Sequence, residues 1–200
     1  KIPKMADMKP IKPPIVEAED LVYRPYLRDP EKLSRSWAIP GTLGLRHRIG
    51  GLEKENVSGN VSHDPENHQI MCEFRAEKVR RVANYIDPQN IIGEESGELL
   101  VVSWGGTFGV MIEAVKEMQS QGKSISLAHF HHINPLPNNT AEIFSRFKKI
   151  IVPELNLGQF VLFLRMQFQQ FKFHQYNKIQ GLPFMVSELV EKFNEILEEK

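Results

Sequence analysis

Between residues 91 and 200, strand-length apolar runs alternate with helix-length amphipathic stretches, and this alternation constrains the fold more than any other feature of the sequence. The run Leu99–Trp104 is the first of the predicted strands. Strands separated by helices imply right-handed crossovers and a parallel sheet that is covered on both faces. The sequence therefore predicts an α/β domain of three layers with a mostly parallel sheet. Further strands are predicted at 124–130, 149–153 and about 172–177, and helices between 107 and 122 and at about 140–147, 158–166 and 186–197.

The predicted helices of this region differ in how much of their surface is apolar. The helix that Gly122 closes has a single apolar stripe, as has the last helix, whereas the helix that Gly158 opens is apolar on most sides and is expected to be heavily buried. The phenylalanine-rich stretch 160–173 is interpreted as core rather than as a cage for a cofactor. The two stripes are Val110, Met111, Ala114, Val115 and Met118, and Val186, Leu189, Val190, Phe193, Ile196 and Leu197.

The first forty residues are dominated by proline. Proline fixes φ, removes a backbone donor and keeps the preceding residue out of the helical region, so residues 1–45 are expected to be extended and to need another surface to lie on. With no initiator methionine, we interpret the chain as a fragment whose N-terminal neighbour supplies that surface, although trimming during expression gives the same start. The seven prolines, of thirteen in the chain, are Pro3, Pro10, Pro13, Pro14, Pro25, Pro30 and Pro40.

A helix is predicted to begin at the N-cap Asp64, because Pro65 suits the first helical position and Glu66 suits the positive end of the helix dipole. It is expected to run to about Tyr85 and to end before 87–90. Its apolar contacts are expected to be Ile70, Phe74, Val79 and Val82. The expected organisation is a connector at 1–60, a linker helix at 61–90 and the compact domain at 91–200.

The composition excludes several classes of protein. Twenty-five basic residues balance 25 acidic residues, so no global field attracts nucleic acid or an anionic membrane. A single cysteine, Cys72, excludes an internal disulfide, a thiolate-bound iron–sulfur cluster and a multi-cysteine zinc site, and it favours a reducing, cytoplasmic compartment. No apolar run reaches the roughly 20 residues that span a bilayer.

Polar groups follow each predicted strand, at the edge of a parallel sheet where ligands usually bind. Gly105-Gly106-Thr107 could cradle an anion on backbone amides or could form a tight turn. His129, His131 and His132 could seed a metal site, because His129 and His131 share one strand face, but no third ligand is evident. They could instead form local hydrogen bonds or line an interface. Both a ligand and another protein surface suit such a crevice, and we favour a protein surface. The predicted crevice comprises Gly105, Gly106, Thr107, His131, Asn134, Glu154 and Asn156, with Asn177, Lys178 and Gln180 after the fourth strand.

Two further positions have a functional and a structural interpretation. Arg46, His47 and Arg48 stand in a glycine-rich loop, from which arginine can bind a carboxylate or phosphate of a substrate or cofactor, or can pair with a missing domain. Glu154 could be a catalytic carboxylate or could cap a turn, since Asn156 and Gly158 follow it.

Five stretches, taken in their order along the chain, resemble the alpha chain of 2-oxoacid:ferredoxin oxidoreductases. Together they extend over nearly the whole chain, and the style of residues 44–68 indicates the 2-oxoglutarate type. Family members usually carry Glu where Arg46 stands, so a role that depends on that carboxylate is in doubt. The stretches are Gly44-Leu45-Arg46-His47-Arg48-Ile49-Gly50-Gly51-Leu52-Glu53-Lys54, the segment from Gly59-Asn60 to His68, Asn134-Pro135-Leu136-Pro137, Val152-Pro153-Glu154-Leu155-Asn156-Leu157-Gly158-Gln159, and Lys178-Ile179-Gln180-Gly181-Leu182-Pro183-Phe184.

The resemblance implies that 91–200 is similar to the C-terminal domain of transketolase, in which one strand of the parallel sheet is commonly reversed. Residues 1–60 would be the tail of the domain that binds the pyrimidine of thiamine pyrophosphate. The complete enzyme decarboxylates a 2-oxoacid, reduces ferredoxin and makes an acyl-coenzyme A. Its thiamine pyrophosphate, magnesium and iron–sulfur cluster are expected in the full complex, because this chain has neither a Gly-Asp-Gly motif with paired asparagines nor several cysteines.

The leading hypothesis is therefore an accessory part of the alpha subunit, which serves subunit assembly and forms part of the active-site wall. The expected partners are the beta subunit, the rest of the alpha subunit, and ferredoxin and coenzyme A through the complex. No catalytic residue is assigned, and the isolated chain is predicted to be inactive and to bind no cofactor. The alternatives are a free-standing Rossmann-like domain that binds a nucleotide or anion, and a pure assembly module.

Overall fold

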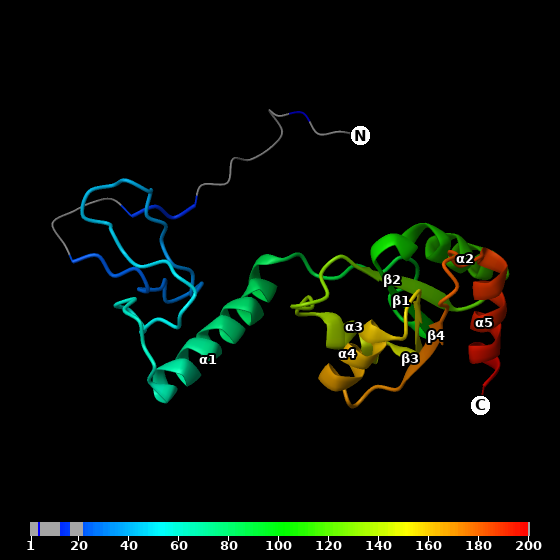
Figure 1. Ribbon diagram of the computed structural model, residues 1–200. Coiled ribbons are helices and arrows are strands. Elements are labelled where there is room, and N and C mark those ends of the chain that lie inside the picture. The colour runs from blue at the N-terminus through cyan, green and yellow to red at the C-terminus, as the bar shows by residue number, and fades with distance from the viewer. Residues whose placement is uncertain (1–3, 5–12, 17–21, 200) are drawn as a thin grey trace. The chain divides into compact units, whose positions relative to one another are not determined.

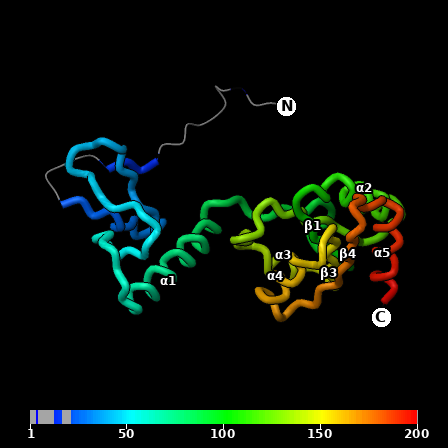
Figure 2. The backbone as a smooth tube through the Cα atoms, viewed as in Figure 1, coloured from blue at the N-terminus to red at the C-terminus, as the bar shows by residue number. Residues whose placement is uncertain are grey.

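The computed structural model describes Lys4 and residues 13–16 and 22–199, which form two compact units (Figures 1 and 2). The first unit extends to Val82 and the second begins at Ala83. Pro3 and Pro10, on which part of the expected extended leader depended, lie outside the described residues. The expected boundaries at residues 60 and 90 remain predictions.

The second unit contains a four-stranded sheet in which every pair of neighbouring strands is parallel. The strands are β1 (Gly97–Trp104), β2 (Ile125–Phe130), β3 (Phe147–Glu154) and β4 (Phe173–Asn177). Their order across the sheet is β2-β1-β3-β4. The α/β class predicted from the alternation is therefore confirmed. The reversed strand that the family resemblance implied is reduced to a single antiparallel bridge, in which Ile92 exchanges two backbone hydrogen bonds with Leu127 (2.8 and 2.9 Å).

Helices cover both faces of this sheet, which gives three layers (Figure 1). The helices α2 (Phe108–Ser120) and α5 (Val186–Glu198) pack on Leu99 and Val101, whereas α3 (Thr140–Ser145) and α4 (Gln159–Gln167) pack on Leu100 and Val102. Because successive residues of a strand point to opposite faces, one apolar run supplies both cores. Phenylalanines dominate the second core, as predicted: Phe130, Phe144, Phe147, Phe160 and Phe173 are buried, and Phe163, Phe168 and Phe171 pack against them.

Two sequence predictions for this unit were wrong in detail. The helix predicted to reach residue 147 ends at Ser145, and Phe147 already pairs with Gly97 as the first residue of β3. The helix α4 is not buried on most sides, since only Phe160, Val161 and Leu164 are buried while Leu162 and Met166 are 59% and 63% exposed. One helix face is enough to cover one face of the sheet, so the other apolar side chains lie at the surface.

The first unit is built mainly from loops. Its described part contains isolated bridges, such as Tyr26 with Val57 and Lys54 with Val61, followed by α1 (Pro65–Arg81). The 3-10 turn η2 (Val82–Tyr85) begins at the last residue of this unit and continues into the second. The predicted N-cap is confirmed, because the Asp64 carboxylate accepts hydrogen bonds from the amides of Glu66 (3.1 Å) and Asn67 (3.2 Å).

Of the four predicted apolar contacts of α1, only Phe74 is partly buried, with the Arg28 guanidinium 4.8 Å from the centre of its ring. Ile70, Val79 and Val82 are exposed, and the buried side chains of this helix are Asn67 and Met71. Polar groups also attach the helix to the loops. The amide of Asn67 receives a bond from the backbone of Asn56 and donates one to the carbonyl of Lys54, each 2.9 Å long.

One of the fully buried side chains in the loops of the first unit is a lysine. The side chain of Lys54 is fully buried, and its ammonium donates to the carbonyls of Gly50 (2.7 Å) and Leu52. These bonds fix the loop that follows Arg48. Among the described residues, no helix is long and apolar enough to cross a membrane.

Candidate functional sites

The direction of the crossovers reverses between β1 and β3, where open α/β sheets usually bind ligands. Here the position is occupied by Glu154, the last residue of β3, which is 1% exposed. One carboxylate oxygen accepts from the Trp104 indole (3.3 Å), the Asn156 amide (3.1 Å) and the backbone N–H of Phe160 (3.0 Å). The other accepts from the backbone N–H of Val161 at 3.0 Å.

These bonds decide between the two interpretations of Glu154. The first free amides of a helix are the groups that would bind a phosphate, and in α4 they already bind the carboxylate. Asn156 completes the cap, since its side-chain oxygen accepts from the amides of Gly158 (2.7 Å) and Gln159 (3.1 Å). With four donors and almost no exposure, Glu154 caps and orients α4, as the structural interpretation held.

An open crevice of about 490 Å³ lies instead at the ends of β1 and β2, whose last residues, Trp104 and Phe130, are register partners. The polar groups on its wall are His129 and His131, whose rings meet edge to face with centroids 5.2 Å apart. Burial lowers the pKa of His129, and the neighbouring His131 lowers it further, so His129 is neutral at pH 7. The lining residues are Trp104, Gly105, Phe108, His129, Phe130, His131 and Ile133.

The structure brings together only part of the crevice expected from the sequence. Gly105 and His131 line it, whereas the Thr107 hydroxyl turns back to the carbonyl of Trp104 (2.9 Å) and Asn134 is exposed outside it. Gly106 is likewise absent from its wall. The sequence reasoning missed Trp104 and Phe108, because a strand end and a helix start gave no sign that both rings flank one opening. Among the described residues, no group of three His, Cys, Asp or Glu side chains could hold a metal ion.

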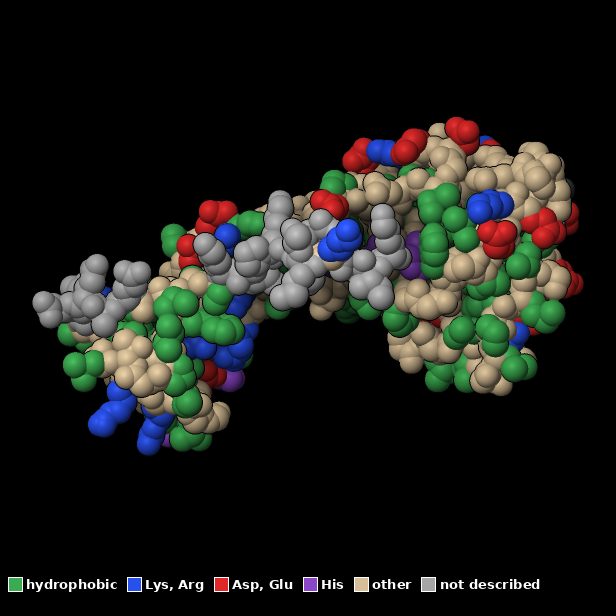
Figure 3. Space-filling model, turned by 90° about the horizontal axis from the view of Figure 1, so that it is seen from above, with side chains coloured by type: hydrophobic (Ala, Val, Ile, Leu, Met, Phe, Trp, Pro, Cys, Tyr) green, Lys and Arg blue, Asp and Glu red, His purple; other side chains and the backbone are tan. Residues whose placement is uncertain are grey.

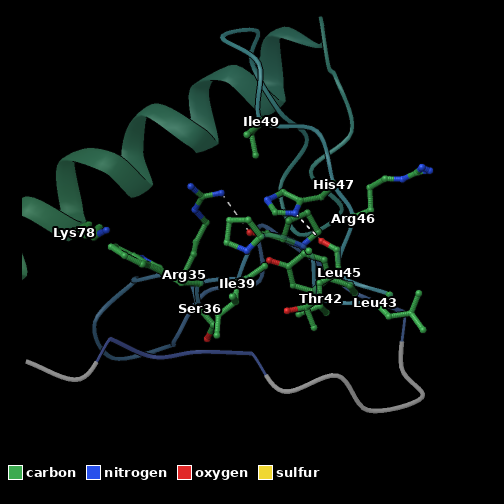
Figure 4. Close-up of a pocket in the computed structure, with 17 residues that line it drawn as sticks. Arg35, Ser36, Ile39, Thr42, Leu43, Leu45, Arg46, His47, Ile49 and Lys78 are labelled. Atoms are coloured by element: carbon green, nitrogen blue, oxygen red, sulfur yellow. Dashed lines mark hydrogen bonds between the residues drawn. The ribbon is translucent and has the colours of Figure 1, made fainter.

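The first unit contains a larger pocket of about 1060 Å³, which Figure 4 shows in close-up. Its wall carries the cationic side chains Arg35, Arg46 and Lys78, together with His47, and no carboxylate. The apolar part of the wall is exposed, so the pocket combines positive charge with unburied hydrophobic surface. The lining residues are Tyr23, Pro25, Arg35, Ser36, Trp37, Ala38, Ile39, Pro40, Gly41, Thr42, Leu43, Gly44, Leu45, Arg46, His47, Ile49 and Lys78.

Two of these polar side chains are held in place. Arg35 donates to the carbonyl of Pro25 (3.3 Å), and its guanidinium lies 4.0 Å from the centre of the Tyr26 ring. The Nδ1 atom of His47 lies 2.9 Å from the carbonyl of Leu45. In Figure 4 the side chains of Arg35 and His47 point into the pocket, whereas that of Arg46 points away. Of the predicted trio, Arg48 is exposed and does not line the pocket, so His47 and the unpredicted Arg35 are the better placed groups.

A third group of polar residues lies where α1 meets the loops. The Glu53 carboxylate binds the Nδ1 atom of His68 (2.7 Å) and the guanidinium of Arg75 (3.3 Å), and these bonds lower the pKa of Glu53, with His68 the larger cause. Arg75 also donates to the exposed Cys72 thiol at 3.1 Å. The cluster attaches α1 to the segment around Glu53.

Comparison with known proteins identifies several relatives, although no family model matches the chain. The chain is 36% identical over 191 residues to the 2-oxoglutarate oxidoreductase subunit KorA of Mycobacterium tuberculosis, which covers 94% of this chain and 28% of that protein. It is 31% identical over 148 residues to subunit alpha of 2-oxoacid:ferredoxin oxidoreductase 1 of Aeropyrum pernix, covering 70% of this chain and 23% of that one. The chain thus spans about a quarter of the length of these curated relatives.

One solved structure is similar to this chain over nearly its whole length. It is a 2-oxoglutarate:ferredoxin oxidoreductase from Magnetococcus marinus with 2-oxoglutarate, coenzyme A and succinyl-CoA bound. The match has a TM-score of 0.88 at 27% identity, and it covers 98% of this chain and 34% of that chain. Both units of this chain therefore have counterparts in a single known polypeptide.

Proposed function

Because this chain belongs to the family of 2-oxoacid:ferredoxin oxidoreductase alpha subunits, we propose that it works as part of such an enzyme. The reaction is the oxidative decarboxylation of a 2-oxoacid to an acyl-coenzyme A with reduction of ferredoxin. The observation that carries the proposal is the similarity over 98% of the chain to one solved oxidoreductase chain, across two units of very different construction.

The proposed substrate is 2-oxoglutarate. The Mycobacterium tuberculosis relative is named for this substrate, and the Magnetococcus marinus structure holds 2-oxoglutarate and succinyl-CoA. A dicarboxylate needs cationic partners, and the pocket of the first unit offers Arg35 and Lys78, with no carboxylate among the described residues that line it. The charges on this wall therefore suit an anion, and Arg46 adds a further guanidinium to the lining.

The residues of this chain do not fit the cofactors of the complete enzyme. A single cysteine cannot hold an iron–sulfur cluster, and the described residues offer no three-ligand group for a metal ion. We assign thiamine pyrophosphate, magnesium and the cluster to other parts of the complex. This chain then contributes a wall of the substrate pocket and contacts with the beta subunit and the remainder of the alpha subunit, in the cytoplasm.

The test is co-expression of this chain, joined to the rest of its alpha subunit, with the beta subunit. We expect a stable complex that reduces ferredoxin with 2-oxoglutarate faster than with pyruvate. Arg35→Met in the complex should raise the KM for 2-oxoglutarate about tenfold or more, whereas Arg24→Met, outside the pocket, should leave it unchanged. A complex that reduces ferredoxin equally well with pyruvate, or not at all, contradicts the proposal.

A free-standing domain that binds a nucleotide receives less support, because Glu154 already occupies the amides of α4 that a phosphate would use. Titration calorimetry of the chain alone separates the two. We expect no heat of binding with thiamine pyrophosphate and magnesium, and saturable binding of either would favour the alternative.

A further inference from the structure

The crevice at the ends of β1 and β2 has flat apolar walls. Trp104, Phe108 and Phe130 supply aromatic rings, and Ile133 supplies an aliphatic side chain. The Phe108 ring lies with its centroid 4.9 Å from that of His129, so the imidazole is flanked rather than free to turn. A volume of about 490 Å³ lies within the roughly 300–1,000 Å³ range of small-molecule sites.

The hydrogen bond behind His129 determines which nitrogen carries the proton. Its Nδ1 atom lies 2.8 Å from the hydroxyl oxygen of Ser103, a side chain with no exposure at all. No other side-chain hydrogen bond of Ser103 exists among the described residues, and a buried hydroxyl without an acceptor is costly. The hydroxyl therefore donates to Nδ1, and the neutral ring carries its proton on Nε2.

The Nε2–H group is a donor without an acceptor. His129 is 7% exposed, and among the described residues its ring nitrogens have no hydrogen bond except the one to Ser103. The Nε2 atom has no partner and yet is not fully buried, so it borders open space. His129 lines the crevice, and we place Nε2 there. Among the described residues, no carboxylate lines this crevice.

We propose that this crevice binds a small aromatic acid, whose ring lies between the aromatic walls and whose carboxylate accepts the Nε2–H of His129. A planar ring gains edge and face contacts with Trp104 and Phe108, which an aliphatic body of the same size cannot make. The carboxylate replaces water as the acceptor of an N–H group that has no partner among the described residues. The site lies outside the pocket of the first unit and is independent of the function proposed above.

The intrinsic fluorescence of Trp104 provides the measurement, because the chain has two tryptophans and Trp37→Phe leaves Trp104 as the only one. The probe is benzoate, and cyclohexanecarboxylate is the control for the aromatic ring. We expect saturable quenching by benzoate with a Kd below about 1 mM, and binding at least about tenfold weaker for cyclohexanecarboxylate.

Variants then test the hydrogen bond. His129→Phe keeps a flat ring but removes the donor and should weaken benzoate binding about tenfold. Ser103→Ala frees the imidazole to place its proton on Nδ1 and should weaken binding severalfold, which a merely structural serine would not do in a variant of unchanged circular dichroism. His132→Ala, exposed and outside the crevice, is the matched control.

Three results would overturn the assignment: no saturable quenching up to about 50 mM, equal affinity for the two acids, or full affinity in both His129→Phe and Ser103→Ala. Loss of benzoate binding in the complex with the beta subunit would also overturn it, because the crevice would then be covered by protein.

Discussion

The two units of this chain differ in how far their apolar side chains are buried. In the second unit the sheet hides Leu99, Leu100, Val101 and Val102 completely, with helices on both sides. In the described part of the first unit, the buried leucine and methionine side chains are Leu33, Leu45 and Met71, while many other apolar side chains are exposed. The exposed group includes Trp37 (66%), Ile39 (54%), Leu43 (92%) and Ile49 (84%).

Cationic side chains lie on the same unit as these exposed apolar side chains. Figure 3 shows apolar side chains (green) on the surface of the first unit, with arginines and lysines (blue) on the same unit. Soluble monomers seldom expose contiguous apolar patches, and such patches usually mark interaction sites. The comparison indicates that the second unit completes its own core, whereas the described part of the first unit leaves many apolar side chains exposed. We predict that another protein surface covers them.

The largest effect is expected when the units are separated. Residues 83–200 alone should fold and unfold cooperatively, because both sheet faces are covered within that segment. Residues 1–82 alone should lack a cooperative transition, since their few buried apolar side chains cannot offset the loss of chain entropy. Circular dichroism and urea unfolding measure both pieces. A cooperative transition in 1–82 would contradict the comparison.

Substitution of one leucine in each unit tests the difference between the units within the intact chain. Leu100→Ala removes a fully buried side chain from the second unit and should cost about 2–5 kcal/mol of the free energy of unfolding. Leu43→Ala removes a side chain that is 92% exposed in the first unit and should change stability by less than about 0.5 kcal/mol. Urea unfolding of both variants gives these values. The Leu43 variant should nevertheless weaken binding to the beta subunit, which a solvent-exposed leucine in the complex would not do.

The cap of α4 should matter less than the core. Glu154→Gln keeps the shape of the side chain but loses the charge and turns an N–H group toward backbone donors, so it should cost about 2–3 kcal/mol. Glu113→Gln is the control, because Glu113 forms an exposed ion pair with Lys116 (3.0 Å). If both variants unfold at the same urea concentration, Glu154 does not act as a cap.

Among the destabilising variants, the smallest effect is expected at the polar contact in the first unit. Asn67→Ala leaves the N–H of Asn56 and the carbonyl of Lys54 without their partner and should cost about 1–2 kcal/mol. Hydrogen exchange of residues 54–61 should rise in this variant and stay unchanged in residues 99–102. Gln69→Ala on the exposed side of α1 is the control.

Sequence reasoning succeeded where structure depends on neighbours along the chain. The run Leu99–Trp104 and the sequence Asp64-Pro65-Glu66 contain their own strand and cap signals, and both are present as predicted. It failed where the outcome depends on distant partners. Ile70 and Val79 suit a helix stripe, but few residues of the first unit pack there, so they are exposed.

The candidate sites show the same limit. The sequence indicated the edge of the sheet and offered a cap as one role of Glu154, yet it gave no sign of the bond from the Trp104 indole, 50 residues away. Likewise, the role of Arg35 in the pocket depends on the folding of the loop around His47 beside it (Figure 4). Arg46, which the sequence favoured, points away from the pocket in the same view.

The most direct test of the central claim is hydrogen exchange of the whole alpha subunit, alone and bound to the beta subunit, read over both units of this segment. The account predicts that amides of residues 35–49, beside the exposed apolar side chains, become protected at least about tenfold on binding, while those of β1 and β3 do not change. Equal exchange of residues 35–49 in the free and bound states would contradict the claim that another protein surface completes the first unit.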